Sequence, residues 1–268
     1  MCIRDRWIYY IQSSQGYCQL RRVGVDTGET SPVRGLEPYA HLSQPAISAQ
    51  GVLACVASAP QLPPRVLTLD PETGATRIVA RSSGENVPPE ALAACEPISW
   101  DSGSAGRVHG LYYAPDAAGC AQRPKPPLVV LVHGGPTSQA TAGYAAQAQF
   151  LATRGYAVLA VNYRGSSGYG RAYRNALREQ WGLADADDAV SGARHLAALG
   201  RVDPERLVIM GRSAGGLTVL QALIRYPGFF HAGVCLYGVT NLFSLAADTH
   251  KFEQHYLDSL IGPLPGSV

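Results

Sequence analysis

The sequence lacks an apolar run long enough to cross a bilayer, although 46% of its 268 residues are hydrophobic. Its longest apolar segments, such as Leu128–Val132 and Tyr156–Val161, are far shorter than the roughly 20 residues of a spanning helix. The N-terminus also lacks the basic and then apolar pattern of an export signal. We therefore expect no membrane segment and no export signal.

An excess of charge of one sign is absent too. The 22 Lys and Arg residues nearly balance the 20 Asp and Glu residues, and the net charge is +2. The chain contains neither a basic stripe nor an acidic tail, so nothing predicts a nucleic acid or an anionic lipid as a partner. The length and apolar content are those of a globular protein with one full core and part of a second.

Paired cysteine motifs are missing, although the chain has six cysteines. Without C-x-x-C or Cys/His spacing we expect no zinc site, and no sequence motif indicates another cofactor. Cys55, Cys95 and Cys235 lie in apolar stretches, where a free thiol packs as a small hydrophobic group. This pattern favours a reducing compartment and predicts a cytoplasmic protein.

Short strands separated by turns fill the first part of the chain, residues 1–81. The segments "VDTGET" and "LDPETGAT" place Asp26 and Asp70 in similar turns, 44 residues apart. This interval is typical of a β-propeller blade of four strands, so we expect about two blades here. Two unrelated hairpins with similar turn chemistry are the alternative. Residues 82–95 are rich in Ser, Gly and Pro, which predicts a connector.

Strands and helices alternate in residues 96–268, after two further strands at 96–100 and 106–115. We expect a strand at 128–132, a helix over 144–154 closed by Gly155, and a strand at 156–163. A second helix begins around Asp185 and ends at Gly200, before a strand at 206–210. The alternation predicts an α/β domain with a parallel sheet covered on both faces.

The segment "MGRSAGG", residues 210–216, contains the G-x-S-x-G pattern of a nucleophile elbow, in which a strained serine sits between a strand and a helix. Ser213 is therefore the candidate nucleophile. Gly211 and Gly215 remove side chains that would collide across the turn. The alternative is a serine that only caps the following helix.

"VHGGP" follows the strand at 128–132, and its glycines would let the backbone approach a substrate carbonyl. We expect the N–H groups of Gly135 and Ala214 to form an oxyanion hole. An ordinary strand-to-loop turn is the alternative. We expect His133 to be structural, because in the chain order of this kind of site the general base comes after the nucleophilic serine.

Four motifs together resemble one enzyme family. "HGGP", "NYRGSSGYGRAY", "WGLADADDAV" and "GRSAGG" occur in the order found in the catalytic domain of the prolyl oligopeptidase family. Within that family the sequence is most similar to the acylaminoacyl-peptidase and dipeptidyl-peptidase branch. The resemblance implies an α/β-hydrolase fold preceded by a β-propeller, with Ser213 as nucleophile and Gly135 and Ala214 as oxyanion donors.

The resemblance also implies a pocket for the residue before the cleaved bond, with Val239 and Leu242 in its lining. Both residues could equally be ordinary core. An apolar pocket would fit an uncharged side chain. We assign no chemistry to Arg164.

The sequence departs from the family after the serine. The family's triad runs Ser, Asp, His, and only 55 residues follow Ser213. Asp248 with His231, His250 or His255 is an alternative, but Asp248 and His255 lie in one expected helical stretch, whereas this fold takes the two groups from loops after different strands. We therefore expect the triad Asp and His to lie outside this chain, and the chain to be an inactive fragment that begins within a propeller, with no blade pattern in residues 1–6.

These observations predict a serine-type peptidase that hydrolyses short peptides through an acyl-enzyme on Ser213. An esterase or lipase of the same fold and a catalytically silent binding module are the alternatives. The sequence does not determine the oligomeric state.

Overall fold

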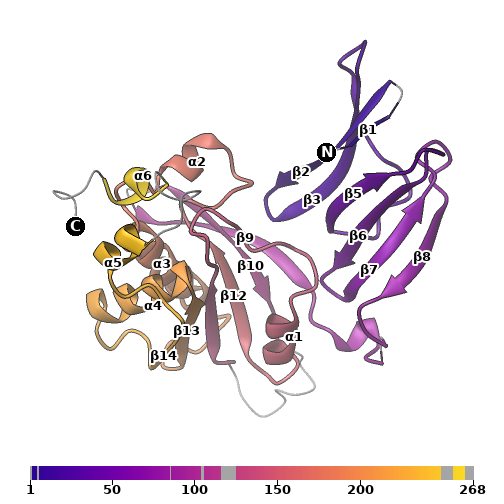
Figure 1. The fold of residues 1–268 in the computed structure, drawn as a ribbon. Coiled ribbons are helices and arrows are strands. Elements are labelled where there is room, and N and C mark those ends of the chain that lie inside the picture. The colour runs from indigo at the N-terminus through magenta and orange to yellow at the C-terminus, as the bar shows by residue number, and fades with distance from the viewer. Residues whose placement is uncertain are drawn as a thin grey trace. The chain divides into compact units, whose positions relative to one another are not determined.

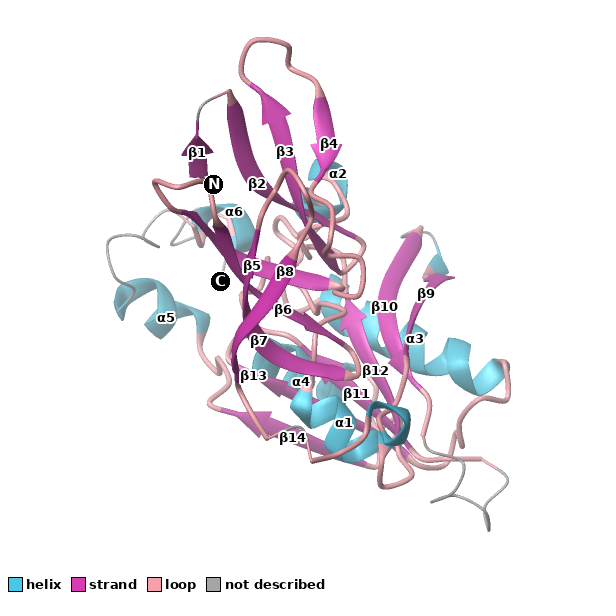
Figure 2. Cartoon of the chain, turned by 90° about the vertical axis from the view of Figure 1, so that its right-hand side faces the viewer, coloured by secondary structure: helices cyan, strands magenta, loops and turns pink. Residues whose placement is uncertain are grey.

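The structure is a computed structural model that describes residues 2–4, 6–84, 86–103, 106–115, 125–248 and 256–262 (Figures 1 and 2). The chain forms two compact units. The first comprises Met1–Cys95 with Thr141–Phe150, and the second comprises Glu96–Ala140 with Leu151–Val268. A segment from the middle of the chain thus packs with the N-terminal unit, which the strand and helix pattern does not predict.

The first unit consists of two antiparallel meanders of four strands each within the described residues (Figure 1). In the described part of this unit, one parallel residue pair, Cys18 with His41, joins the two meanders. The first meander contains β1 (Cys2–Arg4), β2 (Trp7–Ser14), β3 (Tyr17–Gly24) and β4 (Thr30–Pro32), and the second contains β5 (His41–Ile47), β6 (Leu53–Ala59), β7 (Leu62–Leu69) and β8 (Thr76–Arg81). A short 3₁₀ helix, η1 (Pro89–Ala91), follows them.

The turn repeat is present, but its register differs from the predicted one. The β3–β4 and β7–β8 turns are closed by equivalent hydrogen bonds: Gly28 N–H donates to Gly24 O, and Gly74 N–H donates to Asp70 O, both at 2.8 Å. Positions 24 and 70 are therefore equivalent, and the repeat is 46 residues rather than the 44 between Asp26 and Asp70. Asp26 and Asp70 therefore occupy different positions in their turns. The sequence comparison aligned them by residue type, whereas the backbone hydrogen bonds define the equivalent positions.

The second unit contains a six-stranded sheet in the order β14-β13-β11-β12-β10-β9. Its strands are β9 (Cys95–Asp101), β10 (Arg107–Tyr113), β11 (Leu128–Val132), β12 (Ala157–Asn162), β13 (Leu207–Arg212) and β14 (Ala232–Leu236). Strands β12, β11, β13 and β14 are parallel, as predicted. β10 runs antiparallel to β12, so the sheet is mixed rather than wholly parallel. The apolar pattern of a strand does not encode its direction, and sheets that combine parallel and antiparallel strands are common.

The described helices are α1 (Ala146–Ala152), α2 (Arg171–Asn175), α3 (Ala184–Ala198), α4 (Ala214–Arg225), α5 (Leu242–Asp248) and α6 (Asp258–Ile261). The predicted helix over 144–154 is α1, which is shorter by two residues at each end. Gly155 and Gly200, with φ of +89° and +71°, follow α1 and α3 as the expected terminating glycines. The stretch expected to be helical between Asp248 and His255 lies largely outside the described residues.

The core of the second unit fixes the strands from which the candidate site emerges. Val130 and Val132 of β11 and Leu207 and Ile209 of β13 are at most 4% exposed. They belong to one apolar cluster with side chains from α3 and α4, among them Val190, Leu196 and Val219. Since β11 and β13 are neighbouring parallel strands, the residues that follow them emerge at the same edge of the sheet.

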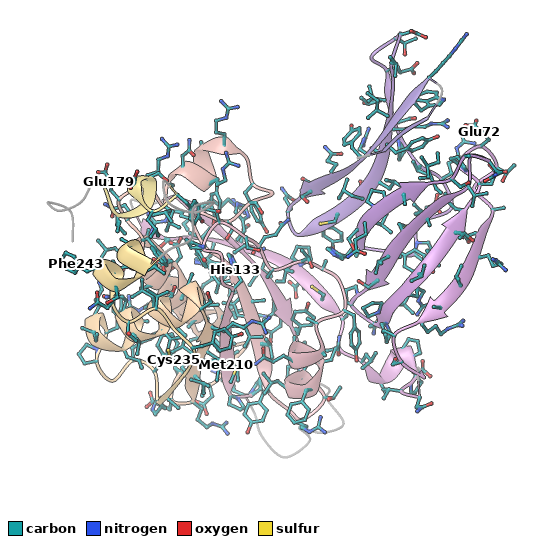
Figure 3. All side chains as sticks on the ribbon, in the orientation of Figure 1. Glu72, His133, Glu179, Met210, Cys235 and Phe243 are labelled. Carbon is teal, nitrogen blue, oxygen red and sulfur yellow. The ribbon has the colours of Figure 1, made fainter. Side chains whose placement is uncertain are left out.

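The three cysteines expected in apolar surroundings differ in exposure. Cys55 is buried and Cys95 is intermediate, but Cys235 is exposed, so the expectation is wrong for Cys235. The reason is its place on β14, the outermost described strand of the sheet, where it pairs with Gly211 of β13 (Figure 3). Among the described residues, no helix is long and apolar enough to span a membrane, and no group of three His, Cys, Asp or Glu residues could hold a metal ion.

Candidate active site

Ser213 lies in a strained turn between β13 and α4. Its backbone has φ 54° and ψ −125°, a region that residues with a side chain rarely occupy. Ser213 N–H donates to Leu236 O at 3.1 Å, and Ser213 O accepts from Gly216 N–H at 2.9 Å. These backbone bonds maintain the turn, and the side chain of Ser213 is exposed.

The Ser213 hydroxyl does not cap α4. No hydrogen bond of this hydroxyl is recorded within the described part of the chain. Ser213 therefore differs from an ordinary N-cap serine, whose oxygen accepts from the backbone of the first turn. A strained, exposed and unpartnered hydroxyl is the geometry of a nucleophile elbow.

The glycines of the elbow allow the backbone to pack closely. A Cβ built on Gly211 would collide with Gly215 O. A Cβ on Gly215 would lie 2.5 Å from Val132 O and 2.8 Å from His133 O, well inside van der Waals contact. The start of α4 is thus pressed against the end of β11, which is possible only with glycine at this position.

The loop His133–Pro136 passes directly beside Ser213. A Cβ built on Gly134 would lie 3.5 Å from Ser213 Cβ and 3.9 Å from Ser213 Oγ. Gly135 follows in the same loop, with φ +128° and an exposed backbone. The structure therefore brings the two motifs together, and it adds Gly134, which the sequence did not single out, as the loop residue packed against Ser213.

Ala214 is the first residue of α4, and the first N–H groups of a helix have no partner within it. Within the described residues neither Ala214 N–H nor Gly135 N–H donates a recorded hydrogen bond. Both donors remain available to an incoming oxygen, and the N-terminus of α4 adds a partial positive charge.

His133 is engaged in holding the loop. Nδ1 lies 2.8 Å from Gly134 O, and Nε2 lies 2.8 Å from Ser166 Oγ. Because a carbonyl oxygen can only accept, Nδ1 carries the proton, and Nε2 accepts from the serine hydroxyl. Burial lowers the pKa of His133 to about 4, so the ring stays neutral at physiological pH. These contacts agree with a structural role.

Two tyrosines brace the same loop, and the sequence analysis missed both. Tyr163 stacks on His133 with ring centroids 4.3 Å apart, and its hydroxyl donates to Pro136 O at 2.7 Å. The Tyr256 hydroxyl lies 2.8 Å from Thr137 Oγ1. Tyr256 is 119 residues from its partner, so no local pattern could have found this contact.

Of the two candidate pocket residues, Val239 contacts the backbone of the serine. Val239 N–H donates to Ser213 O at 3.3 Å, and Leu242 is the first residue of α5. Both side chains are partly buried and pack against the core of the second unit. This arrangement is compatible with a pocket lining and with ordinary packing.

No described histidine hydrogen-bonds to Ser213. His231 N–H donates to Leu207 O at the start of β13, roughly 20 Å of strand away from the serine. His109 and His195 stack on Tyr169 and Trp100. His250 and His255, and the side chain of Asp248, lie outside the described residues, so the alternative triad cannot be placed.

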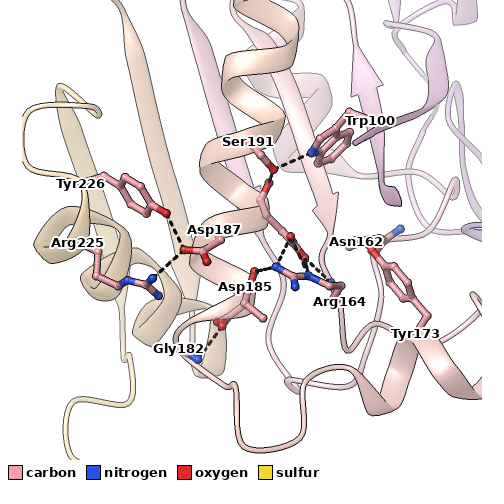
Figure 4. A network of polar contacts seen from close by, with 12 residues as sticks. Trp100, Asn162, Arg164, Tyr173, Gly182, Asp185, Asp187, Ser191, Arg225 and Tyr226 are labelled. Atoms are coloured by element: carbon pink, nitrogen blue, oxygen red, sulfur yellow. Dashed lines mark hydrogen bonds and ion pairs between the residues drawn. The ribbon is translucent and has the colours of Figure 1, made fainter. Parts of the chain in front are cut away.

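The motifs "NYRGSSGYGRAY" and "WGLADADDAV" meet in a polar network behind the site (Figure 4). Arg164 forms an ion pair with the fully buried Asp188, with NH2 2.9 Å from Oδ1. Asp185 accepts from Thr218 Oγ1 at 2.5 Å and from Gly182 N–H at 2.6 Å. Arg164, to which the sequence assigned no chemistry, thus has a structural partner.

The match to a known family covers Ser213, Val239 and Leu242 but begins after the loop His133–Pro136. Residues 142–263 match the prolyl oligopeptidase family. These residues are a prolyl oligopeptidase family domain. The resemblance drawn from the four motifs is confirmed.

The relatives include both kinds of enzyme in the predicted branch, a dipeptidyl aminopeptidase and an acylamino-acid-releasing enzyme. The chain is 37% identical over 134 residues to dipeptidyl aminopeptidase BIII of Pseudoxanthomonas mexicana, covering 50% of this chain and 19% of the relative. It is 32% identical over 123 residues to the acylamino-acid-releasing enzyme of Arabidopsis thaliana, covering 46% of this chain and 16% of that enzyme. The chain thus spans less than a fifth of the length of these relatives.

Solved structures of the family match nearly the whole chain. A puromycin-hydrolyzing peptidase of Mycobacterium tuberculosis has a TM-score of 0.85 and 33% identity, and the match covers 97% of this chain and 40% of that one. The acylaminoacyl peptidase of Pyrococcus horikoshii, at 23% identity and a TM-score of 0.80, shows the same fold. The predicted fold class, an α/β-hydrolase domain preceded by part of a β-propeller, is confirmed.

Proposed function

We propose that the protein carrying this chain is a serine-type peptidase that cleaves short peptides through an acyl-enzyme on Ser213. The observation that carries the proposal is the strained Ser213 hydroxyl, which has no hydrogen-bond partner among the described residues and lies beside the loop His133–Pro136. The prolyl oligopeptidase family match over residues 142–263 supports peptide bonds as the substrate class.

In this mechanism Ser213 Oγ loses its proton to a general base and attacks the carbonyl carbon of the scissile bond. The carbonyl oxygen becomes an oxyanion, which accepts hydrogen bonds from Gly135 N–H and Ala214 N–H. Collapse of the tetrahedral intermediate releases the amine, which takes up the proton, and leaves an acyl group on Ser213. Water then releases the acyl group by the same steps. The proposal takes the base and its orienting Asp from outside the described residues, because no described histidine hydrogen-bonds to Ser213.

Val239 and Leu242 would line the pocket for the residue before the cleaved bond and favour an uncharged side chain. The hydrogen bond from Val239 N–H to Ser213 O and the place of Leu242 at the start of α5 support this assignment. We further propose residues 1–81 as the propeller part, 82–95 as a connector and 96–268 as the hydrolase part. A cytoplasmic location stays a prediction from the cysteine pattern.

The test is labelling and turnover in the complete protein. A fluorophosphonate should modify Ser213, and Ser213→Ala should abolish labelling and lower kcat by about 10⁴-fold or more while the fold is retained. Ser244→Ala, an exposed serine of α5, is the matched control and should leave both unchanged. Peptide turnover by Ser213→Ala would refute the proposal, and turnover of esters but not peptides would favour an esterase.

A further inference from the structure

The first turns of α3 contain three aspartates with different surroundings. Asp185 and Asp188 are 0% exposed, whereas the Asp187 side chain is 36% exposed. Asp187 binds Arg225 at 3.1 Å and the Tyr226 hydroxyl at 2.7 Å, both at the far end of α4 from Ser213 (Figure 4). The two buried carboxylates instead point to the two halves of the candidate active site.

Asp185 is joined to the helix that begins at the nucleophile. Its Oδ2 accepts from Thr218 Oγ1, and Thr218 lies one turn after Ala214 in α4. The Thr218 hydroxyl also lies 3.4 Å from Ala214 O, so the contact reaches the first residue of the helix. Gly182 N–H occupies the other oxygen of Asp185. Asp185 therefore determines how far the first turn of α4 stands from α3.

Asp188 is joined to the loop on the other side of Ser213. It accepts from the backbone N–H of Arg164 at 2.8 Å and from Arg164 Nε at 3.0 Å. The neighbouring residue, Tyr163, is 1% exposed and contacts the loop His133–Pro136 twice. Its ring stacks on His133, and its hydroxyl donates to Pro136 O. Fixing the backbone at Arg164 therefore fixes Tyr163 and the loop above it.

We propose that Asp185 and Asp188 are positioning residues that together set the spacing between Ser213 and the oxyanion loop His133–Pro136. This inference rests on the proposed function of Ser213. The two carboxylates are three residues apart in one rigid helix, α3, so both halves of the site are held by hydrogen bonds to the same helix. Oxyanion stabilisation needs donors at hydrogen-bond distance, about 2.7–3.1 Å, from the oxygen on which charge develops, so a small error in their placement weakens it. Because the oxyanion exists only in the transition state, this spacing determines rate rather than binding.

The charges around the two aspartates differ. Asp188 pairs with the guanidinium of Arg164. Asp185 accepts from two neutral donors, the Thr218 hydroxyl and Gly182 N–H, and it also interacts electrostatically with the Tyr163 hydroxyl and with the like charge of Asp188. Burial raises the pKa of both carboxyls, that of Asp185 to about 6, and the N-terminus of α3 offsets part of the cost. Burying a carboxylate in such surroundings destabilises the folded state, which favours a role for these residues beyond stability.

The experiment compares, in the complete protein, small changes at the α4 contact of Asp185 and at the Tyr163 contact of the loop His133–Pro136. Thr218→Val keeps the volume and removes the hydrogen bond to Asp185, and we expect kcat to fall about 10- to 100-fold with KM within about threefold. Thr218→Ser restores the hydroxyl and should restore kcat to within about threefold. Tyr163→Phe removes the bond to Pro136 O and should give the same kcat effect. Asp187→Asn is the matched control on α3 and should leave kcat unchanged.

Amide exchange separates this inference from the proposed function, because it does not require turnover. We expect Thr218→Val to speed exchange in residues 211–218, Tyr163→Phe to speed it in residues 133–137, and Asp187→Asn to do neither. Unchanged exchange in both segments, or Thr218→Val and Thr218→Ser with equal kcat, would overturn the positioning role. If Ser213→Ala still turns over peptide, the proposed function fails, and the exchange result alone decides the positioning role.

Discussion

The strain at Ser213 predicts that the nucleophile can be replaced with a gain in stability. At φ 54° and ψ −125° the Cβ of Ser213 is held in a region where a residue other than glycine costs on the order of 1–3 kcal/mol. Ser213→Gly removes this cost. The greater freedom of glycine in the unfolded chain takes back about 0.5–1 kcal/mol, so we expect a net gain of about 1 kcal/mol.

Ser213→Ala keeps the Cβ and hence the strain. Because the Ser213 hydroxyl forms no hydrogen bond with the part of the chain that the structure describes, Ser213→Ala should stay within about 0.5 kcal/mol of the parent. The assay is urea unfolding of the 268-residue chain, with the three proteins compared at one protein concentration. A gain of 1 kcal/mol corresponds to a rise in Tm of roughly 2–4 °C for a chain of this size.

Ser244→Gly provides the control, since Ser244 lies in the exposed part of helix α5. There a glycine should destabilise by up to about 1 kcal/mol, the opposite sign. If Ser213→Gly proves no more stable than Ser213→Ala, the turn is not strained as described, and the argument that the backbone presents the hydroxyl loses its physical basis.

Four further predictions concern the site. A side chain at Gly135 would meet Ser138 N at 2.7 Å, so Gly135→Ala should displace the loop and lower kcat by roughly 10²–10³-fold, and an effect confined to KM would contradict the oxyanion role. Gly215→Ala should push α4 from β11, cost about 1–3 kcal/mol in urea unfolding and slow fluorophosphonate labelling; unchanged labelling would show that the contact is not needed. Because burial raises the pKa of Asp185 from 3.8 to about 6, the folded state binds an extra proton between these values, so stability should fall by about 3 kcal/mol in total as pH rises from about 3 to 7; Asp185→Asn should lack this slope, and equal slopes would refute the assignment. The 268-residue chain alone should show no peptide turnover, and turnover that disappears in His250→Ala or His255→Ala would place the base within it.

Several features of this protein could be predicted from the sequence because they depend on neighbours along the chain. The elbow is one, since Gly211, Ser213 and Gly215 lie within five residues and are flanked by a strand and a helix. The parallel part of the second sheet is another, because apolar runs alternating with helical periodicity have few other solutions. The glycines that end α1 and α3 also follow from local backbone requirements.

Other features depend on contacts between distant residues, and only the tertiary structure decided them. No local pattern brings Tyr256 to Thr137, or shows that Gly134 rather than Gly135 lies against Ser213. The 46-residue register of the turns required the backbone hydrogen bonds, and the antiparallel direction of β10 required its pairing with β12. The buried aspartates of α3 show the reason most clearly. Their letters are the same as that of the exposed Asp187, and only packing against α4 and Arg164 makes them different, because burial and hydrogen-bond partners are properties of the assembled fold.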